Sequence, residues 1–63
     1  MQNKIREIAK QKELSISSVI KNTGLSKSYV YEIINNQTEP SLTNSRKIAH
    51  VLGESLNEVF PEN

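Results

Sequence analysis

Residues 23–36 read "TGLSKSYVYEIINN", and this stretch decides the fold. Gly24 can adopt a left-handed backbone conformation without steric cost, so it predicts a tight turn at the end of a helix. Ser26 can accept a hydrogen bond from a backbone N–H three residues on, and so begin the next helix. The apolar residues of that helix recur at helical spacing and are Val30, Ile33 and Ile34. We therefore expect two short helices joined by a turn, the second presenting a polar face.

The segment before Gly24 also shows helical spacing. We expect a first helix over residues 3–12 and a second that begins at Ser15 and ends at Thr23. The inward residues of these two helices are expected to be Ile5, Ile8, Ala9, Val19 and Ile20. No strand-like alternation competes with this interpretation.

Two more helices are expected after the loop "QTEP" at residues 37–40. Ser41 or Thr43 begins the fourth helix, and Gly53 ends it. Its inward residues are expected to be Leu42, Ile48, Ala49, Val51 and Leu52. The stretch "SLNE" at residues 55–58 has the spacing of a capping box and begins the fifth helix. The sequence therefore predicts an all-α fold, a compact bundle of five short helices.

The composition argues against several classes of function. A chain of 63 residues allows one domain, which we expect to span residues 1–63. It has no Cys, no Asp and a single His, His50, so we expect no enzyme, metal, cofactor or small-molecule ligand. No apolar run approaches the roughly 20 residues of a membrane span, and the N-terminus lacks the apolar core of a signal peptide. We expect a cytoplasmic protein.

Five segments carry a resemblance to a known family: "TGLSKSYV" at 23–30, "PSL" at 40–42, "KIA" at 47–49, "LG" at 52–53 and "SLNEVF" at 55–60. In this order and at these spacings, the chain from Ile5 to Phe60 resembles the repressor/Cro-type (XRE) family of helix-turn-helix DNA-binding domains. The resemblance implies a lambda-repressor-like bundle in which the second and third helices form the helix-turn-helix. It also implies a DNA-binding transcriptional regulator, a repressor or Cro-like protein, that places the recognition helix at 26–35 in the major groove.

The chain departs from the family pattern at four positions. The family commonly pairs an Arg in the first helix with a Glu in the third, and Ala9 and Ile34 stand at those positions. Exchange of a buried ion pair for packed apolar groups is often neutral or stabilising, so we expect Ala9 to contact Ile34. Ile20 replaces a small Ala, which predicts a wider or changed crossing of the two motif helices. Ile16 replaces a Gln that commonly bridges to phosphate, so phosphate anchoring must come from elsewhere.

The polar face of the third helix predicts the residues that contact DNA. Helical geometry turns Lys27, Ser28, Tyr31, Glu32 and Asn35 away from the apolar residues. Lys27 can donate to guanine, Ser28 can bond several base edges, and Glu32 can accept from cytosine. The resemblance and this chemistry together imply base contacts from Lys27, Ser28, Tyr31 and Glu32. An ordinary solvated helix surface is the alternative for Lys27, Ser28 and Glu32, and contact with sugar or phosphate is the alternative for Tyr31. By resemblance and chemistry, phosphate contacts are expected from Ser15, Ser17, Ser26, Tyr29, Asn35 and Thr38, with Tyr29 semi-buried.

The charge distribution predicts weak binding by one copy. Residues 26–41 hold one Lys and two Glu, a net charge of −1, whereas the first twelve residues are positive. Few phosphates are then neutralised, so we expect a homodimer on double-stranded operator DNA with a palindromic sequence, its recognition helices ~34 Å apart. Val59 and Phe60 are candidates for the dimer contact, with packing in the core as the simpler alternative for Phe60.

A second function is also compatible with the same fold. The low charge of residues 26–41 and the apolar Ile16 also suit a protein-interaction module, an antagonist that pairs with another regulator rather than reading DNA. The matches within residues 23–30 favour DNA binding instead.

Overall fold

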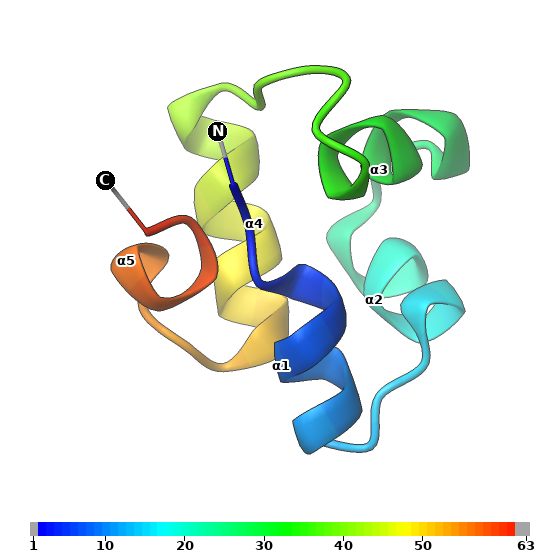
Figure 1. The fold of residues 1–63 in the computed structure, drawn as a ribbon. Helices are drawn as coiled ribbons and strands as arrows, with labels where there is room; N and C mark the ends of the chain where they lie inside the picture. The colour runs from blue at the N-terminus through cyan, green and yellow to red at the C-terminus, as the bar shows by residue number, and fades with distance from the viewer. Residues whose placement is uncertain (1, 62–63) are drawn as a thin grey trace.

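The computed structural model describes residues 2–61, and this part of the chain contains five helices and no strand. Their bounds are α1 Ile5–Gln11, α2 Ile16–Thr23, α3 Lys27–Ile34, α4 Leu42–Leu52 and α5 Leu56–Val59. Figure 1 shows α2 and α3 together on one side of the molecule and α5 on the other, with α4 running beside α5. The prediction of an all-α bundle with a helix-turn-helix at α2 and α3 is confirmed.

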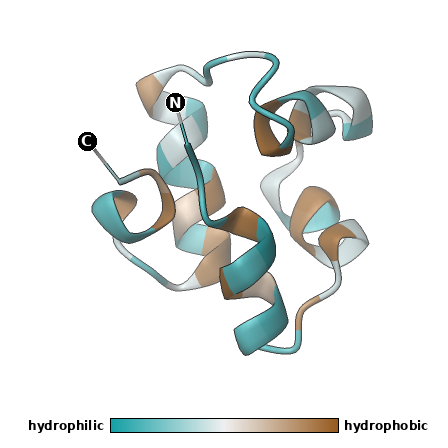
Figure 2. Ribbon diagram, in the orientation of Figure 1, coloured by the Kyte–Doolittle hydropathy of each residue, from teal (hydrophilic) through white to brown (hydrophobic). Residues whose placement is uncertain are grey.

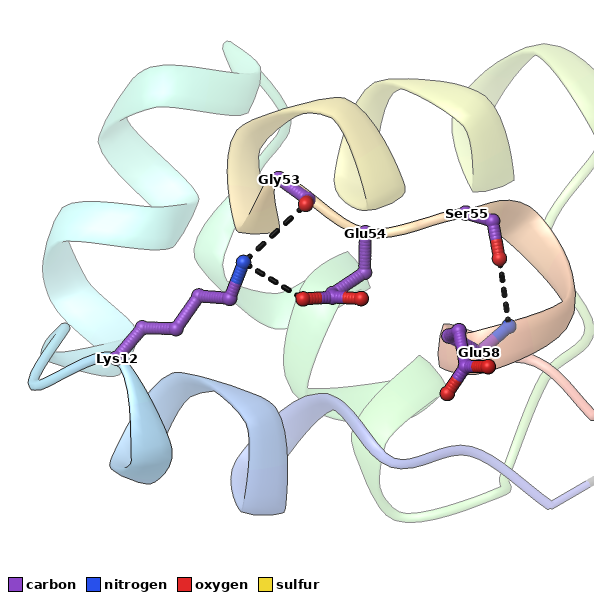
Figure 3. A network of polar contacts seen from close by, with 5 residues as sticks. All are labelled: Lys12, Gly53, Glu54, Ser55 and Glu58. Carbon is purple, nitrogen blue, oxygen red and sulfur yellow. Dashed lines mark hydrogen bonds and ion pairs between the residues drawn. The ribbon is translucent and has the colours of Figure 1, made fainter.

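Serine hydroxyls begin four of the helices in the described part of the chain. In each case Oγ accepts a hydrogen bond from the backbone N–H three residues on; the four are Ser15, Ser26, Ser41 and Ser55. Each such cap contributes about 1 kcal/mol of helix stability. The residue that caps α4 is therefore Ser41 rather than Thr43. Ser55 caps α5 by accepting from the backbone N–H of Glu58 (Figure 3). Gly24 and Gly53 end α2 and α4 at φ +75° and +70°.

The helices enclose one apolar core, and Figure 2 shows apolar segments on each of α1 to α5. Its fully buried larger side chains are Ile5, Val19, Val30, Ile33, Ile48, Leu52 and Val59. Ala9 and Ile34 are buried in the same core, with exposed fractions of 1% and 7%, as their apolar replacement predicted. Their direct contact stays a prediction. Ile16 and Ile20 are half-buried and pack against this core.

Two expectations are wrong, the inward position of Leu42 and a dimer contact through Val59 and Phe60, for which core packing was the alternative at Phe60. Leu42 does not face inward but is 56% exposed. It is the first residue of α4, directly after the capping Ser41, and the buried residues of this helix begin only at Ser45. A helical wheel treats the helix as endless and cannot show this. Val59 and Phe60 are 0% and 5% exposed, so core packing accounts for both and neither is available to a second copy.

The first helix is shorter than predicted because the residues before it make tertiary contacts. The backbone N–H of Lys4 donates to the carbonyl of Val59 at 2.8 Å, which fixes the chain ahead of α1. At the other end of α1, Nζ of Lys12 contacts the carbonyl oxygen of Gly53 at 3.2 Å and Oε2 of Glu54 at 2.8 Å (Figure 3). Both ends of α1 are thus joined to the region of α4 and α5. None of the helices in residues 2–61 is long and apolar enough to cross a membrane.

Candidate nucleic-acid interface

The turn between α2 and α3 is held by one buried threonine. Oγ1 of Thr23 donates to the carbonyl of Ile20 at 2.8 Å and accepts from the backbone N–H of Leu25 at 3.2 Å. Gly24 supplies the left-handed turn, and Ser26 caps the next helix three residues after Thr23. The direction in which α3 leaves α2 is therefore fixed by local hydrogen bonds together with packing.

The structure separates α3 into a buried face and an exposed one. Val30, Ile33 and Ile34 are buried at 0%, 1% and 7% exposure. The predicted outward residues Lys27, Ser28, Glu32 and Asn35 are all exposed. This face therefore offers an ammonium donor, a hydroxyl and a carboxylate to whatever approaches it.

Tyr31 differs from its predicted base-reading neighbours. It is half-buried and packs against the core, and the guanidinium carbon of Arg6 lies 6.0 Å from the centroid of its ring. Arg6 comes from α1, so this contact joins α1 to the flank of α3. Sequence patterns did not predict this contact, because the two residues are far apart along the chain.

Tyr29 occupies the opposite flank of α3 and is semi-buried as predicted. Its hydroxyl oxygen accepts a hydrogen bond from Nδ2 of Asn44, in the first turn of α4, at 3.0 Å. The hydroxyl proton remains for an external acceptor such as a phosphate oxygen. Asn44 thus orients the ring, a role that sequence reasoning missed.

The other predicted phosphate contacts lie at the start of α2, at the two ends of α3 and in the loop after α3. Ser15 and Ser26 cap α2 and α3, and because each hydroxyl accepts from an amide its own proton stays free to donate. Ser17 is exposed in the first turn of α2. Asn35 is exposed at the end of α3, and Thr38 is half-buried in the loop that follows. Ser26, Asn35 and Thr38 thus lie at the two ends of α3, whereas Ser15 and Ser17 lie at the start of α2.

Asn3 holds the C-terminal end of α3 and was also missed. Its Nδ2 lies 2.9 Å from the carbonyl oxygen of Ile33, 3.3 Å from that of Ile34 and 3.2 Å from Oδ1 of Asn36. Its Oδ1 accepts from the backbone N–H of Ile5 at 3.2 Å. The side chain of Asn3 therefore provides hydrogen-bond partners both for the last turn of α3 and for the first turn of α1.

The described residues offer little for other chemistry. Within residues 2–61 no group of three His, Cys, Asp or Glu side chains comes together as a metal ion would require. His50 is exposed on α4. The exposed cations nearest the start of α1 are Lys4 and Arg6. Residues 26–41, which include α3, carry a net charge of −1.

Comparison with known proteins agrees with this geometry. The family model described as Helix-turn-helix matches residues 5–59, nearly the whole chain. No curated protein matches the sequence.

Proposed function

Because the chain belongs to the helix-turn-helix family of DNA-binding regulators, we propose that it is a sequence-specific transcriptional regulator that inserts α3 into the major groove of an operator. The observation that carries the proposal is the exposed face of α3, where Lys27, Ser28 and Glu32 project while three aliphatic residues hold the helix to the core. A face of this kind can discriminate bases without a dense cluster of cations.

The chemistry of the three side chains gives each a role. Lys27 donates to the O6 and N7 acceptors of guanine, and Glu32 accepts from the N4 amino group of cytosine. Ser28 donates to or accepts from an adjacent base edge. A carboxylate close to phosphates is unfavourable unless it finds a donor, so Glu32 selects against wrong sequences more than it adds affinity.

The contacts with the DNA backbone are proposed to come from groups on α2, on α3 and in the loop after α3. These are the hydroxyls of Ser15, Ser17, Ser26 and Thr38, the phenol of Tyr29 and the amide of Asn35. The capping hydroxyls of Ser15 and Ser26 keep a proton to donate, and Tyr29 is oriented by Asn44. Neutral donors of this type position the protein while contributing little to the salt dependence of binding.

Two copies are proposed to bind one operator. A recognition region of net charge −1 displaces few counterions, so one copy binds weakly. A homodimer on a palindromic site places two α3 helices ~34 Å apart and adds their contacts. Occupation of the operator then represses transcription by excluding other proteins, as a repressor or Cro-like protein would.

Titration of duplex DNA tests this proposal. A duplex recovered by selection from a random pool is compared with a random duplex at two salt concentrations. We expect tighter binding to the selected duplex, weakened by about 1–3 kcal/mol in Lys27→Ala or Ser28→Ala. Lys21→Ala removes an exposed lysine from the last turn of α2 and should bind as the wild type does. Equal binding of both duplexes by the wild type would refute sequence-specific recognition.

The same charge also supports a second candidate function. A face with net charge −1 and an apolar, half-buried Ile16 where phosphate anchoring is usual would suit a protein partner, such as a larger regulator that this chain antagonises. Absence of binding to any duplex at low salt would favour this antagonist over the DNA reader.

A further inference from the structure

Arg6 has an unusual position for an exposed cation. It lies on α1, yet its guanidinium carbon sits over the ring of Tyr31 on α3, 6.0 Å from the centroid. A guanidinium over an aromatic face is held by the electrostatic attraction of the ring. In the part of the chain that the structure describes, Arg6 has no carboxylate partner. Its N–H donors are therefore positioned by the ring but remain available to an anion.

The surroundings place Arg6 beside the exposed face of α3. Tyr31 lies at the border between the buried and exposed faces of that helix, and its ring is half-buried. The hydrogen bond from Asn3 to the carbonyl of Ile33, 2.9 Å long, holds the start of α1 against the last turn of α3. Arg6, at the N-terminal end of α1, is thus next to α3 and exposed to solvent.

The dimensions of the major groove indicate what the side chain of Arg6 would meet on DNA. An α-helix with its side chains is about 10–12 Å across, and the major groove is about 12 Å wide. When α3 fills the groove, groups on its flanks meet the phosphates of the groove walls. One flank holds Tyr29, oriented by Asn44 from α4, and the other holds Tyr31 with Arg6 from α1. Of these four side chains, Arg6 is the one with a full positive charge.

We propose that Arg6 binds a DNA phosphate on the α1 side of α3 and that the ring of Tyr31 positions its guanidinium for this contact. The proposal rests on the DNA binding proposed above and assigns Tyr31 a positioning role instead of a base-reading one. Arginine suits the task because its planar fork of N–H donors matches two phosphate oxygens. The contact adds a cation from α1 to the interface of residues 26–41, whose own net charge is −1.

The salt dependence of binding distinguishes a phosphate contact from a packing role. Affinity for the selected duplex and for a random duplex is measured over a series of salt concentrations with Arg6→Ala. Loss of one phosphate contact should reduce the slope of log K against log salt by about 0.9 per bound copy. At about 0.1 M salt that corresponds to roughly eight-fold weaker binding for each bound copy, by a similar factor on both duplexes.

Arg46→Ala is the matched control. Arg46 is the other arginine of the chain and is exposed on α4. Asn44 points toward α3, and a residue two positions further along a helix is rotated by about 200°, so Arg46 points away from α3. We expect Arg46→Ala to keep the wild-type slope. Arg6→Lys should also keep it, because the charge remains.

Two variants of Tyr31 test the positioning role. Tyr31→Phe retains the ring and should bind within about two-fold of the wild type with unchanged base preference. Tyr31→Leu removes the ring but keeps an apolar contact, and should weaken binding several-fold on both duplexes. A changed base preference in Tyr31→Phe would contradict the assignment and return Tyr31 to base reading.

The outcomes separate this proposal from the function on which it rests. All variants are measured below their melting temperatures, determined by circular dichroism. An Arg6→Ala protein with a lower melting temperature and an unchanged salt slope would overturn the phosphate contact and leave Arg6 as a packing residue. Failure of the wild type to bind any duplex at low salt would instead refute the DNA-binding function itself.

Discussion

Replacement of Asn3 by Ala should destabilise the domain although Asn3 lies outside every helix. Nδ2 donates to the carbonyl of Ile33 at 2.9 Å, and Oδ1 accepts from the backbone N–H of Ile5 at 3.2 Å. Each hydrogen bond contributes about 1 kcal/mol net, so their joint loss should lower the free energy of unfolding by about 2 kcal/mol. For a domain of this size that is a fall of roughly 8–16 °C in melting temperature.

Thermal and urea unfolding, followed by far-ultraviolet circular dichroism, would measure this loss. Asn57→Ala is the matched control, because Asn57 is exposed on α5, and it should stay within about 0.5 kcal/mol of the wild type. Asn3→Asp keeps the acceptor for Ile5 but turns a negative charge toward the C-terminal carbonyls of α3, where the helix dipole opposes it. It should therefore cost at least as much as Asn3→Ala. Equal stability of Asn3→Ala and Asn57→Ala would refute the reasoning.

Three further predictions concern stability. Ile34→Glu buries a charge in the core and should abolish cooperative unfolding. Leu42→Glu, at a 56% exposed position, should change stability by less than about 0.5 kcal/mol. Similar melting curves for the two variants would contradict the assigned burial. Gly24→Ala and Gly53→Ala should each cost about 1–2 kcal/mol in urea unfolding, since both glycines have positive φ, and a neutral effect at either would refute that conformation. Lys12→Ala should lower the free energy of unfolding by at most about 1 kcal/mol, because the ion pair of Lys12 with Glu54 is one-third exposed. This loss should shrink in high salt. A loss independent of salt would argue against a screened ion pair.

The starts of α2, α3 and α5 were predictable because each depends on neighbouring residues. A Ser side chain and the amide three residues later are set by local sequence, so Ser15, Ser26 and Ser55 could be identified without the fold. The same holds for Gly24, whose positive φ is a property of its own backbone. The buried face of α3 followed from spacing alone.

The contacts that hold α3 from outside could not be predicted in this way. Asn3 reaches Ile33, 30 residues along the chain, and Asn44 reaches Tyr29, 15 residues back. Both are ordinary polar residues in sequence and gain their roles only when the helices pack. The prediction for Leu42 was wrong for a related reason, because helical spacing does not show which side chains of a first turn meet neighbouring helices.

One contact replaces a feature that the resemblance implied. The family commonly joins the first and third helices through an Arg and a Glu, and the chain has Ala9 and Ile34 at those positions. Each member of the Arg6 and Tyr31 contact lies three residues earlier, about one turn toward the N-terminus of its helix. The link between α1 and α3 is thus present with different chemistry, a cation over a ring in place of an ion pair.

Selection from a random duplex pool tests the central claim most directly, that the exposed face of α3 reads bases. The wild type should enrich a motif with two-fold symmetry and half-sites one DNA turn apart, and Glu32→Ala should relax one base position in each half-site. Failure of the wild type to enrich any motif would contradict the account.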